Sequence, residues 1–223
     1  MRGAPTSGHA AGLDYDVSLP EGAGDGTTVA VLLHGRGSHK GDLQALGPVL
    51  PESWAIVTPQ APFPGAEWGY GPGWAWYRYI AENRVVAETL DESLVLLYPL
   101  LDALPDTLGF TPGTVVLGGF SQGGTTSVAY ALANPGRVAA ALNLSGFLAS
   151  HVSLPSGAAA AEATPIFWAH GQRDPNIPFG MAISGRDALR QAGVPLVAVD
   201  YPIGHWIVPE AIHEAVAMVE SLG

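Results

Sequence analysis

Cysteine is absent from the 223 residues, which excludes disulfide bonds, thiolate metal sites and a cysteine nucleophile. Long hydrophobic runs are absent as well: no uncharged apolar stretch reaches the roughly 18 residues that a membrane-spanning helix needs. Residues 1–12 are small and polar with one Arg, and they lack the apolar segment of a secretory signal. We expect a flexible leader at 1–12, no insertion into a membrane, and a cytoplasmic protein.

Basic residues are scarce. Lys and Arg number 9 against 20 Asp and Glu, so the formal net charge is −11 at pH 7. A chain with this charge repels the phosphates of nucleic acids and the headgroups of anionic lipids. The composition therefore predicts a protein that acts on a neutral small molecule and has no nucleic-acid partner.

Two kinds of segment alternate along the chain. Short, unbroken apolar runs are typical of parallel strands covered on both faces, and they occupy 29–33, 55–57, 115–117, 138–144, 166–169 and 196–199. Segments with helical spacing occupy 81–104, 122–133, 181–192 and 209–222. An alternating run at 13–19 predicts an antiparallel edge strand. This order and the modest length predict one α/β domain over 1–223, with a mostly parallel central sheet flanked by helices.

Ser121 lies in Gly119-Phe120-Ser121-Gln122-Gly123, directly after one apolar run and directly before a helical segment. The pattern Gly-x-Ser-x-Gly in this context predicts a nucleophile elbow, a sharp turn that raises the serine hydroxyl above the sheet. Small residues two positions before and after the serine are needed because that turn is crowded. The alternative is a tight strand-to-helix turn with an incidental serine.

A serine hydroxyl needs a base to accept its proton, and a carboxylate to orient that base. His205 follows the last apolar run and is our candidate base. The other histidines lie at strand ends, before the serine, before the expected acid or inside the last helix. Asp174 follows the run at 166–169 and is our candidate acid, in the chain order Ser, Asp, His. Asp200 is the second choice because it lies at a strand end, only five positions before His205.

Backbone N–H groups must stabilise the oxyanion that forms when the serine attacks. One donor is expected from Gln122, the residue after the nucleophile, and the other from the loop after an early strand. Leu33-His34-Gly35-Arg36-Gly37 is that loop, and we predict the N–H of Arg36 as the second donor. The loop has no Gly-Lys-Ser/Thr sequence, so nucleotide binding is not indicated.

The segment at 63–77 is rich in Gly, Pro and aromatic residues, and four of its rings are candidates to line a substrate pocket: Trp68, Trp74, Trp76 and Tyr77. The alternative is that these rings pack the segment onto the core. Two pairs of polar residues, His39 with Asp42 and His213 with Glu214, are isolated in the sequence and do not predict a metal site.

With these motifs placed, the chain resembles the phospholipase/carboxylesterase family, the acyl-protein-thioesterase-like branch of the α/β-hydrolases. The matching segments follow the family's order: Leu-His-Gly-Arg-Gly (33–37), Pro-Gln-Ala-Pro (59–62), Trp-Tyr (76–77), Gly-Phe-Ser-Gln-Gly-Gly (119–124), Leu-Ser-Gly (144–146), His-Gly-Gln-Arg-Asp-Pro-Asn-Ile-Pro (170–178) and Gly-His (204–205). The chain departs from the family at Arg36, where Leu is frequent, and in the length of its aromatic segment.

The resemblance implies an α/β-hydrolase fold without a large lid domain, and a Ser121-His205-Asp174 triad with the backbones of Arg36 and Gln122 as oxyanion hole. It also implies hydrolysis of short- to medium-chain carboxylic esters without a cofactor. Two alternatives stay open. One is a thioesterase or lysophospholipase of the same family, and the other is a binding protein on a hydrolase scaffold.

Overall fold

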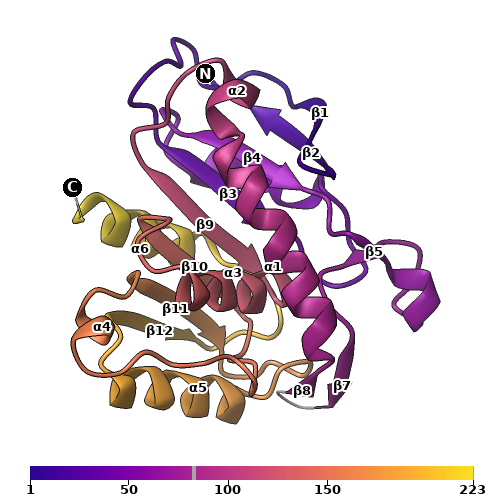
Figure 1. The fold of residues 1–223 in the computed structure, drawn as a ribbon, viewed down its shortest axis with the longest axis vertical. Helices are drawn as coiled ribbons and strands as arrows, with labels where there is room; N and C mark the ends of the chain where they lie inside the picture. The colour runs from indigo at the N-terminus through magenta and orange to yellow at the C-terminus, as the bar shows by residue number, and fades with distance from the viewer. Residues whose placement is uncertain (82–83, 223) are drawn as a thin grey trace.

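The computed structural model describes residues 1–81 and 84–222, which form one eight-stranded sheet with helices on both faces (Figure 1). The strand order is β1-β2-β4-β3-β9-β10-β11-β12. The strands of this sheet are β1 (Thr6–Ala10), β2 (Leu13–Ser18), β3 (Val29–Leu33), β4 (Ala55–Pro59), β9 (Val115–Phe120), β10 (Ala140–Leu144), β11 (Ile166–Gly171) and β12 (Leu196–Tyr201). The helices are η1 (Asp42–Val49), η2 (Gly65–Trp68), α1 (Ala87–Asp102), α2 (Leu104–Leu108), α3 (Gln122–Ala133), α4 (Ala158–Ala161), α5 (Phe179–Ala192) and α6 (Pro209–Glu220).

The six apolar runs of the sequence correspond to β3, β4, β9, β10, β11 and β12. Every neighbouring pair among these strands in the sheet is parallel. The predicted helical segments correspond to α1, α3, α5 and α6, except that the start of the segment 81–104 is not helical: residue 81 ends β7 and residues 84–85 form β8. Helices cover both faces of these strands, which explains why their sequences are apolar throughout rather than alternating. The predicted mostly parallel α/β sheet is confirmed.

The N-terminal region differs from the expected flexible leader. Residues 6–10 form β1, which pairs antiparallel with β2 from Thr6↔Val17 to Ala10↔Leu13. The guanidinium of Arg2 donates hydrogen bonds to the carbonyls of Trp54, Gly47 and Pro51. Because the side chains of β1 are mostly exposed, this strand is held by backbone pairing and leaves no apolar signal in the sequence. The run at 13–19 is antiparallel as predicted, but it lies second in the sheet, since β1 occupies the edge.

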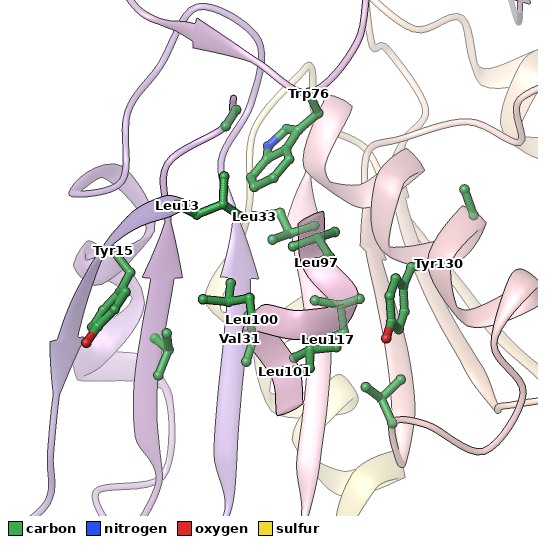
Figure 2. Packing of buried hydrophobic residues seen from close by; sticks show 14 of the residues in the cluster. Leu13, Tyr15, Val31, Leu33, Trp76, Leu97, Leu100, Leu101, Leu117 and Tyr130 are labelled. Atoms are coloured by element: carbon green, nitrogen blue, oxygen red, sulfur yellow. The ribbon is translucent and has the colours of Figure 1, made fainter. Parts of the chain in front are cut away.

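Alternate residues of each central strand enter two different cores. On one face, Val29, Val31 and Leu33 of β3 pack with side chains of α1, α2 and α3, while α5 packs on α3, β10 and β11. On the other face, Ala30 and Leu32 pack with side chains of η1 and α6. Figure 2 shows the first core, where strand residues meet leucines of α1 beneath the ring of Trp76. The sheet is therefore fixed from both sides.

The segment between β4 and α1 forms two small hairpins: β5 (Phe63–Pro64) with β6 (Trp74–Ala75), and β7 (Tyr79–Ala81) with β8 (Arg84–Val85). The β5–η2 part stands out from the body at the right of Figure 1. Both hairpins follow the carboxyl end of β4, at the edge of the sheet where ligands bind in open α/β folds. The loops after β3, β9, β11 and β12 end at the same edge because those strands are parallel.

Candidate active site

Ser121 sits on a strained turn between β9 and α3. Its φ of 55° and ψ of −113° are unusual for a residue with a side chain. A side chain at Gly119 would lie within 2.6 Å of the Leu33 carbonyl oxygen, and one at Gly123 would overlap that same oxygen. The two glycines are thus required by the close approach of β3 to the turn. This turn places the serine at the N-terminus of α3, where the helix dipole favours negative charge.

A chain of short contacts joins the three residues that the motifs singled out. The Nε2 atom of His205 lies 3.0 Å from the Ser121 hydroxyl, and its Nδ1 atom lies 2.6 Å from Oδ2 of Asp174. The other carboxylate oxygen of Asp174 accepts hydrogen bonds from the N–H groups of Asn176 at 2.8 Å and Ile177 at 2.9 Å. The carboxylate side chain has no solvent exposure and is held by these three contacts.

This arrangement fixes the tautomer of His205. An ionised carboxylate can only accept, so Nδ1 of His205 donates to Asp174 and Nε2 is left with its lone pair toward Ser121. The ring also packs against Phe120, at 4.7 Å between centroids. The second-choice acid, Asp200, is instead 2.5 Å from the guanidinium of Arg186, and the structure does not bring it to the histidine.

A second histidine lies beside the acid and was not singled out from the sequence. His170 at the end of β11 donates from Nε2 to the carbonyl of Ile177 at 2.9 Å, and the same nitrogen lies 3.6 Å from Oδ2 of Asp174. Burial lowers the pKa of His170, so the ring is kept neutral. It supports the loop 171–177 from within. Its position four residues before Asp174 is the only signal that the sequence gives.

The loop after β3 is held by the side chain of His34. The Nδ1 atom of this histidine donates to the Gly35 carbonyl at 2.8 Å, while Nε2 accepts from the N–H of Ala61 at 3.1 Å. Burial lowers the pKa of His34 to about 4, so the ring is neutral as these bonds require. In the described part of the chain, the N–H groups of Arg36 and Gln122 have no acceptor.

The aromatic segment is tied to both of these places by hydrogen bonds. The indole N–H of Trp76 donates to the His34 carbonyl at 2.9 Å. The side chain of Gln122 accepts from the backbone N–H of Trp76 at 2.9 Å and donates to the Tyr77 carbonyl at 2.7 Å. Trp76 and Tyr77 are completely buried. The segment therefore connects the β3 loop with the first residue of α3.

The backbone of the β5–β6 hairpin makes a further connection. The N–H of Gly37 donates to the Trp74 carbonyl, and the N–H of Trp74 donates to the Ser38 carbonyl, both at 2.8 Å. These two bonds pair the hairpin with the β3 loop as a short antiparallel bridge. The hairpin therefore contacts the loop after β3 through the main chain of Trp74, and these bonds do not involve its aromatic side chain.

A cavity of about 200 Å³ lies over Ser121, His205 and Gln122. Of the four aromatic residues predicted to line a pocket, Tyr77 does, together with Tyr79, Phe120 and Phe147. The three tryptophans are elsewhere. Trp76 is in the core, Trp74 packs against it, and Trp68 contacts the rings of Phe63 and Tyr70 at 4.9 and 5.9 Å. The three tryptophans bury apolar area within the projecting hairpin and against the core, and this packing stabilises the hairpin on the body of the protein.

The other polar residues considered as metal ligands do not form a cluster in the described part of the chain. Within residues 1–81 and 84–222, no three His, Asp or Glu side chains are placed to hold a metal ion. Asp42 is hydrogen-bonded by the hydroxyl of Ser38 at 2.7 Å, and Glu214 by the hydroxyl of Tyr201 at 2.7 Å. None of the described helices is both long and apolar enough to cross a membrane.

Residues 18–221 match the family described as phospholipase/carboxylesterase, which is nearly the whole of the chain. The chain belongs to this family. Its members among curated proteins include an acyl-protein thioesterase 1 of Gibberella zeae, 31% identical over 117 residues, covering 51% of this chain and 50% of that protein. An acyl-protein thioesterase 1 of Cryptococcus neoformans is 29% identical over 177 residues, or 74% of each chain. The match spans about half the length, or less, of the first relatives.

Solved structures agree on the fold of this phospholipase/carboxylesterase family member. A carboxylesterase from Mesorhizobium loti superposes with a TM-score of 0.80 at 18% identity, over 97% of this chain and 98% of that one. An acyl-protein thioesterase 2 of Zea mays gives 0.76 at 24% identity, over 94% and 99%. The α/β-hydrolase fold that the resemblance implied is confirmed, and the family is one of hydrolases.

Proposed function

We propose that the protein is a serine carboxylesterase in which Ser121 is the nucleophile, His205 the general base and Asp174 the orienting acid. The observation that carries the proposal is the continuous contact from the Ser121 hydroxyl through both nitrogens of His205 to Asp174. This is the geometry that proton transfer from the serine requires.

In the first half of the reaction, the Ser121 oxygen attacks the ester carbonyl and its proton passes to Nε2 of His205. The carbonyl oxygen becomes an oxyanion that accepts hydrogen bonds from the free N–H groups of Arg36 and Gln122. The C–O bond to the alcohol then breaks, and the alcohol leaves with the proton from His205. Asp174 stays ionised and stabilises the imidazolium throughout.

In the second half, His205 takes a proton from water, and the hydroxyl attacks the acyl-serine carbonyl. The ester bond to Ser121 breaks, the serine oxygen regains the proton from His205, and the carboxylic acid departs. A cavity of about 200 Å³ supports short acyl chains, since it is below the roughly 300–1,000 Å³ of pockets that enclose drug-sized ligands.

A thioester is the second candidate substrate, because relatives of this chain bear the name acyl-protein thioesterase. The same steps apply to it, with a thiol as leaving group. The values of kcat/KM for an ester and a thioester with the same acyl group distinguish carboxylesterase from thioesterase activity.

The experiment that tests the proposal combines covalent labelling with turnover. A fluorophosphonate should label the folded wild-type protein at Ser121 and should fail to label Ser121→Ala. A panel of 4-nitrophenyl esters with acyl chains from two to sixteen carbons should show turnover that peaks at the short end. Absence of labelling together with absence of turnover would return the protein to the class of non-catalytic binding proteins.

A further inference from the structure

Arg36 places a positive charge in the wall of the cavity that holds Ser121. Its side chain is exposed and lines that cavity. The guanidinium lies over the ring of Tyr70, with its carbon 4.8 Å from the ring centre. Among residues 1–81 and 84–222, no carboxylate lies within 4 Å of it. Among the described residues, Arg36 therefore forms no direct ion pair with a carboxylate.

The ring of Tyr70, on which the Arg36 guanidinium stacks, is held in place by hydrogen bonds. The hydroxyl of Tyr70 accepts from the N–H of Tyr79 at 2.7 Å and donates to the Tyr79 carbonyl at 3.3 Å. On its other side, a side chain at Gly37 would overlap the Tyr70 carbonyl oxygen, so the loop after β3 and Tyr70 are in direct contact. Tyr79 itself lines the cavity. Stacking on a fixed aromatic ring limits where the guanidinium can go.

Four other basic residues of the described chain are each paired with a carboxylate. Lys40 and Arg186 each have a carboxylate at 2.5 Å, and Arg190 has one at 3.1 Å. Arg137 pairs with Asp102. In a chain with 20 acidic and 9 basic residues, carboxylates are abundant partners. A cation that faces the cavity and lacks a carboxylate leaves its charge available to a ligand.

We propose that Arg36 selects ester substrates that carry an anionic group, a carboxylate or a phosphate, away from the scissile bond. This inference rests on the proposed esterase function, and it differs from the neutral substrate that the net charge led us to expect. The planar guanidinium donates paired hydrogen bonds that match the oxygens of a carboxylate or phosphate. It also offsets locally the repulsion that a chain of charge −11 exerts on anions.

Asp42 acts against this selection and supplies a test of opposite sign. Its carboxylate lines the same cavity and is held by the hydroxyl of Ser38 at 2.7 Å. An anion bound at Arg36 feels the repulsion of this charge. Removing the charge should therefore strengthen the preference for anionic esters, whereas removing the charge of Arg36 should weaken it.

The experiment compares charged and neutral twins of one ester. In the acyl arm, the 4-nitrophenyl ester of adipic acid with a free carboxylate is paired with its methyl ester. In the alcohol arm, 4-carboxy-2-nitrophenyl butyrate is paired with its methyl ester. The measured quantity is the charged-to-neutral ratio of kcat/KM, and dividing the wild-type ratio by the variant ratio cancels the intrinsic reactivity of the two esters. The arms tell which end of the substrate carries the anion.

We expect the ratio to fall about two- to fivefold in Arg36→Gln in at least one arm, the range for a solvent-exposed ion pair. Arg36→Lys should keep part of the preference, and Asp42→Asn should raise the ratio. Arg190→Gln changes the net charge equally but lies on the exposed face of α5, so its ratio should equal that of the wild type. Raising the salt from about 0.05 to about 0.5 M should lower the wild-type ratio through screening.

Equal ratios for the wild type and Arg36→Gln in both arms would overturn the inference, as would an equal fall in Arg190→Gln. If Arg36→Gln does not fold, the salt dependence of the wild-type ratio and the direction of the change in Asp42→Asn decide instead. A charged-to-neutral ratio that changes neither with salt nor in Asp42→Asn refutes the role of Arg36. Failure of the proposed function looks different: neutral twins would then also lack turnover that depends on Ser121.

Discussion

Replacing Gln122 by Leu is the sharpest test of how the aromatic segment serves the site. The substitution keeps the size of the side chain and the backbone N–H, but it removes both hydrogen bonds of the amide. The Trp76 N–H, at 2.9 Å, and the Tyr77 carbonyl, at 2.7 Å, then lose their partners in a fully buried place. We expect two consequences, one for stability and one for catalysis.

The stability cost follows from the two orphaned backbone groups. Each buried group without a partner costs about 1–3 kcal/mol, so the free energy of unfolding should fall by about 2–6 kcal/mol. A domain of this size has roughly 5–15 kcal/mol in total, so the variant is expected to fold but to melt at a lower temperature. Urea denaturation measures this loss directly.

The catalytic cost follows from the position of the amide between the two proposed oxyanion donors. The loss of a complete donor costs about 10²- to 10³-fold in kcat, and a donor that is present but displaced should cost less, about 10-fold or somewhat more. The effect should fall on kcat rather than on KM, because the oxyanion exists only in the transition state. The assay is turnover of a butyrate ester well below the melting temperature, with active sites counted by fluorophosphonate titration.

Gln44→Leu is the matched control. The Gln44 amide also bridges separate segments, since it donates to the Asp16 carbonyl and to the hydroxyl of Thr58 and accepts from Ser18, but it lies on η1, outside the cavity wall. Its loss should lower stability and leave kcat per active site unchanged. Equal kcat per site in Gln122→Leu and Gln44→Leu would refute the positioning role of the Gln122 side chain.

Three further outcomes are expected. Ser121→Ala should lose all burst-phase acylation in stopped-flow assays while its urea midpoint stays near that of the wild type; a remaining burst would contradict the nucleophile. Asp174→Asn should lower kcat by roughly 10⁴-fold because the amide favours the wrong tautomer of His205, and a loss below about tenfold would exclude the role. Stability should fall with pH between about 6.5 and 4, by about 3 kcal/mol, because the unfolded chain protonates His34 at its ordinary pKa and the folded chain only near 4. Urea denaturation measured across that pH range should show a weaker pH dependence of the free energy of unfolding for His34→Gln than for the wild type. An equal pH dependence in the two proteins would refute the role given to His34.

The three residues of the proposed triad could be placed from the sequence because each follows the end of a strand. Parallel strands bring their carboxyl ends to one edge, so an apolar run followed by Ser121, Asp174 or His205 is enough to place all three together. The spacing between them in sequence does not matter to this reasoning. The sequence already favoured Asp174 over Asp200, and in the structure Asp174 contacts His205 whereas Asp200 is paired with Arg186.

The N-terminal strand and the aromatic segment were not predictable in the same way. β1 is held by main-chain pairing with exposed side chains, so it has no hydrophobic period to detect. The tryptophans of 63–77 predict that the segment is buried, but the sequence does not indicate which surface they pack against. That surface includes the loop after β3, and the bridge between Ser38 and Trp74 joins residues that no local pattern connects.

The two roles proposed for position 36 use different parts of the residue, the main-chain N–H for the oxyanion and the side chain for an anionic substrate group. The loop conformation is set by the His34 ring, by the positive φ of Gly37 and by the pairing with Trp74. None of these contacts involves the side chain of Arg36. The N–H donor at this position therefore depends little on which side chain is present. A change of residue there should alter which esters are preferred far more than how fast the acyl transfer itself proceeds.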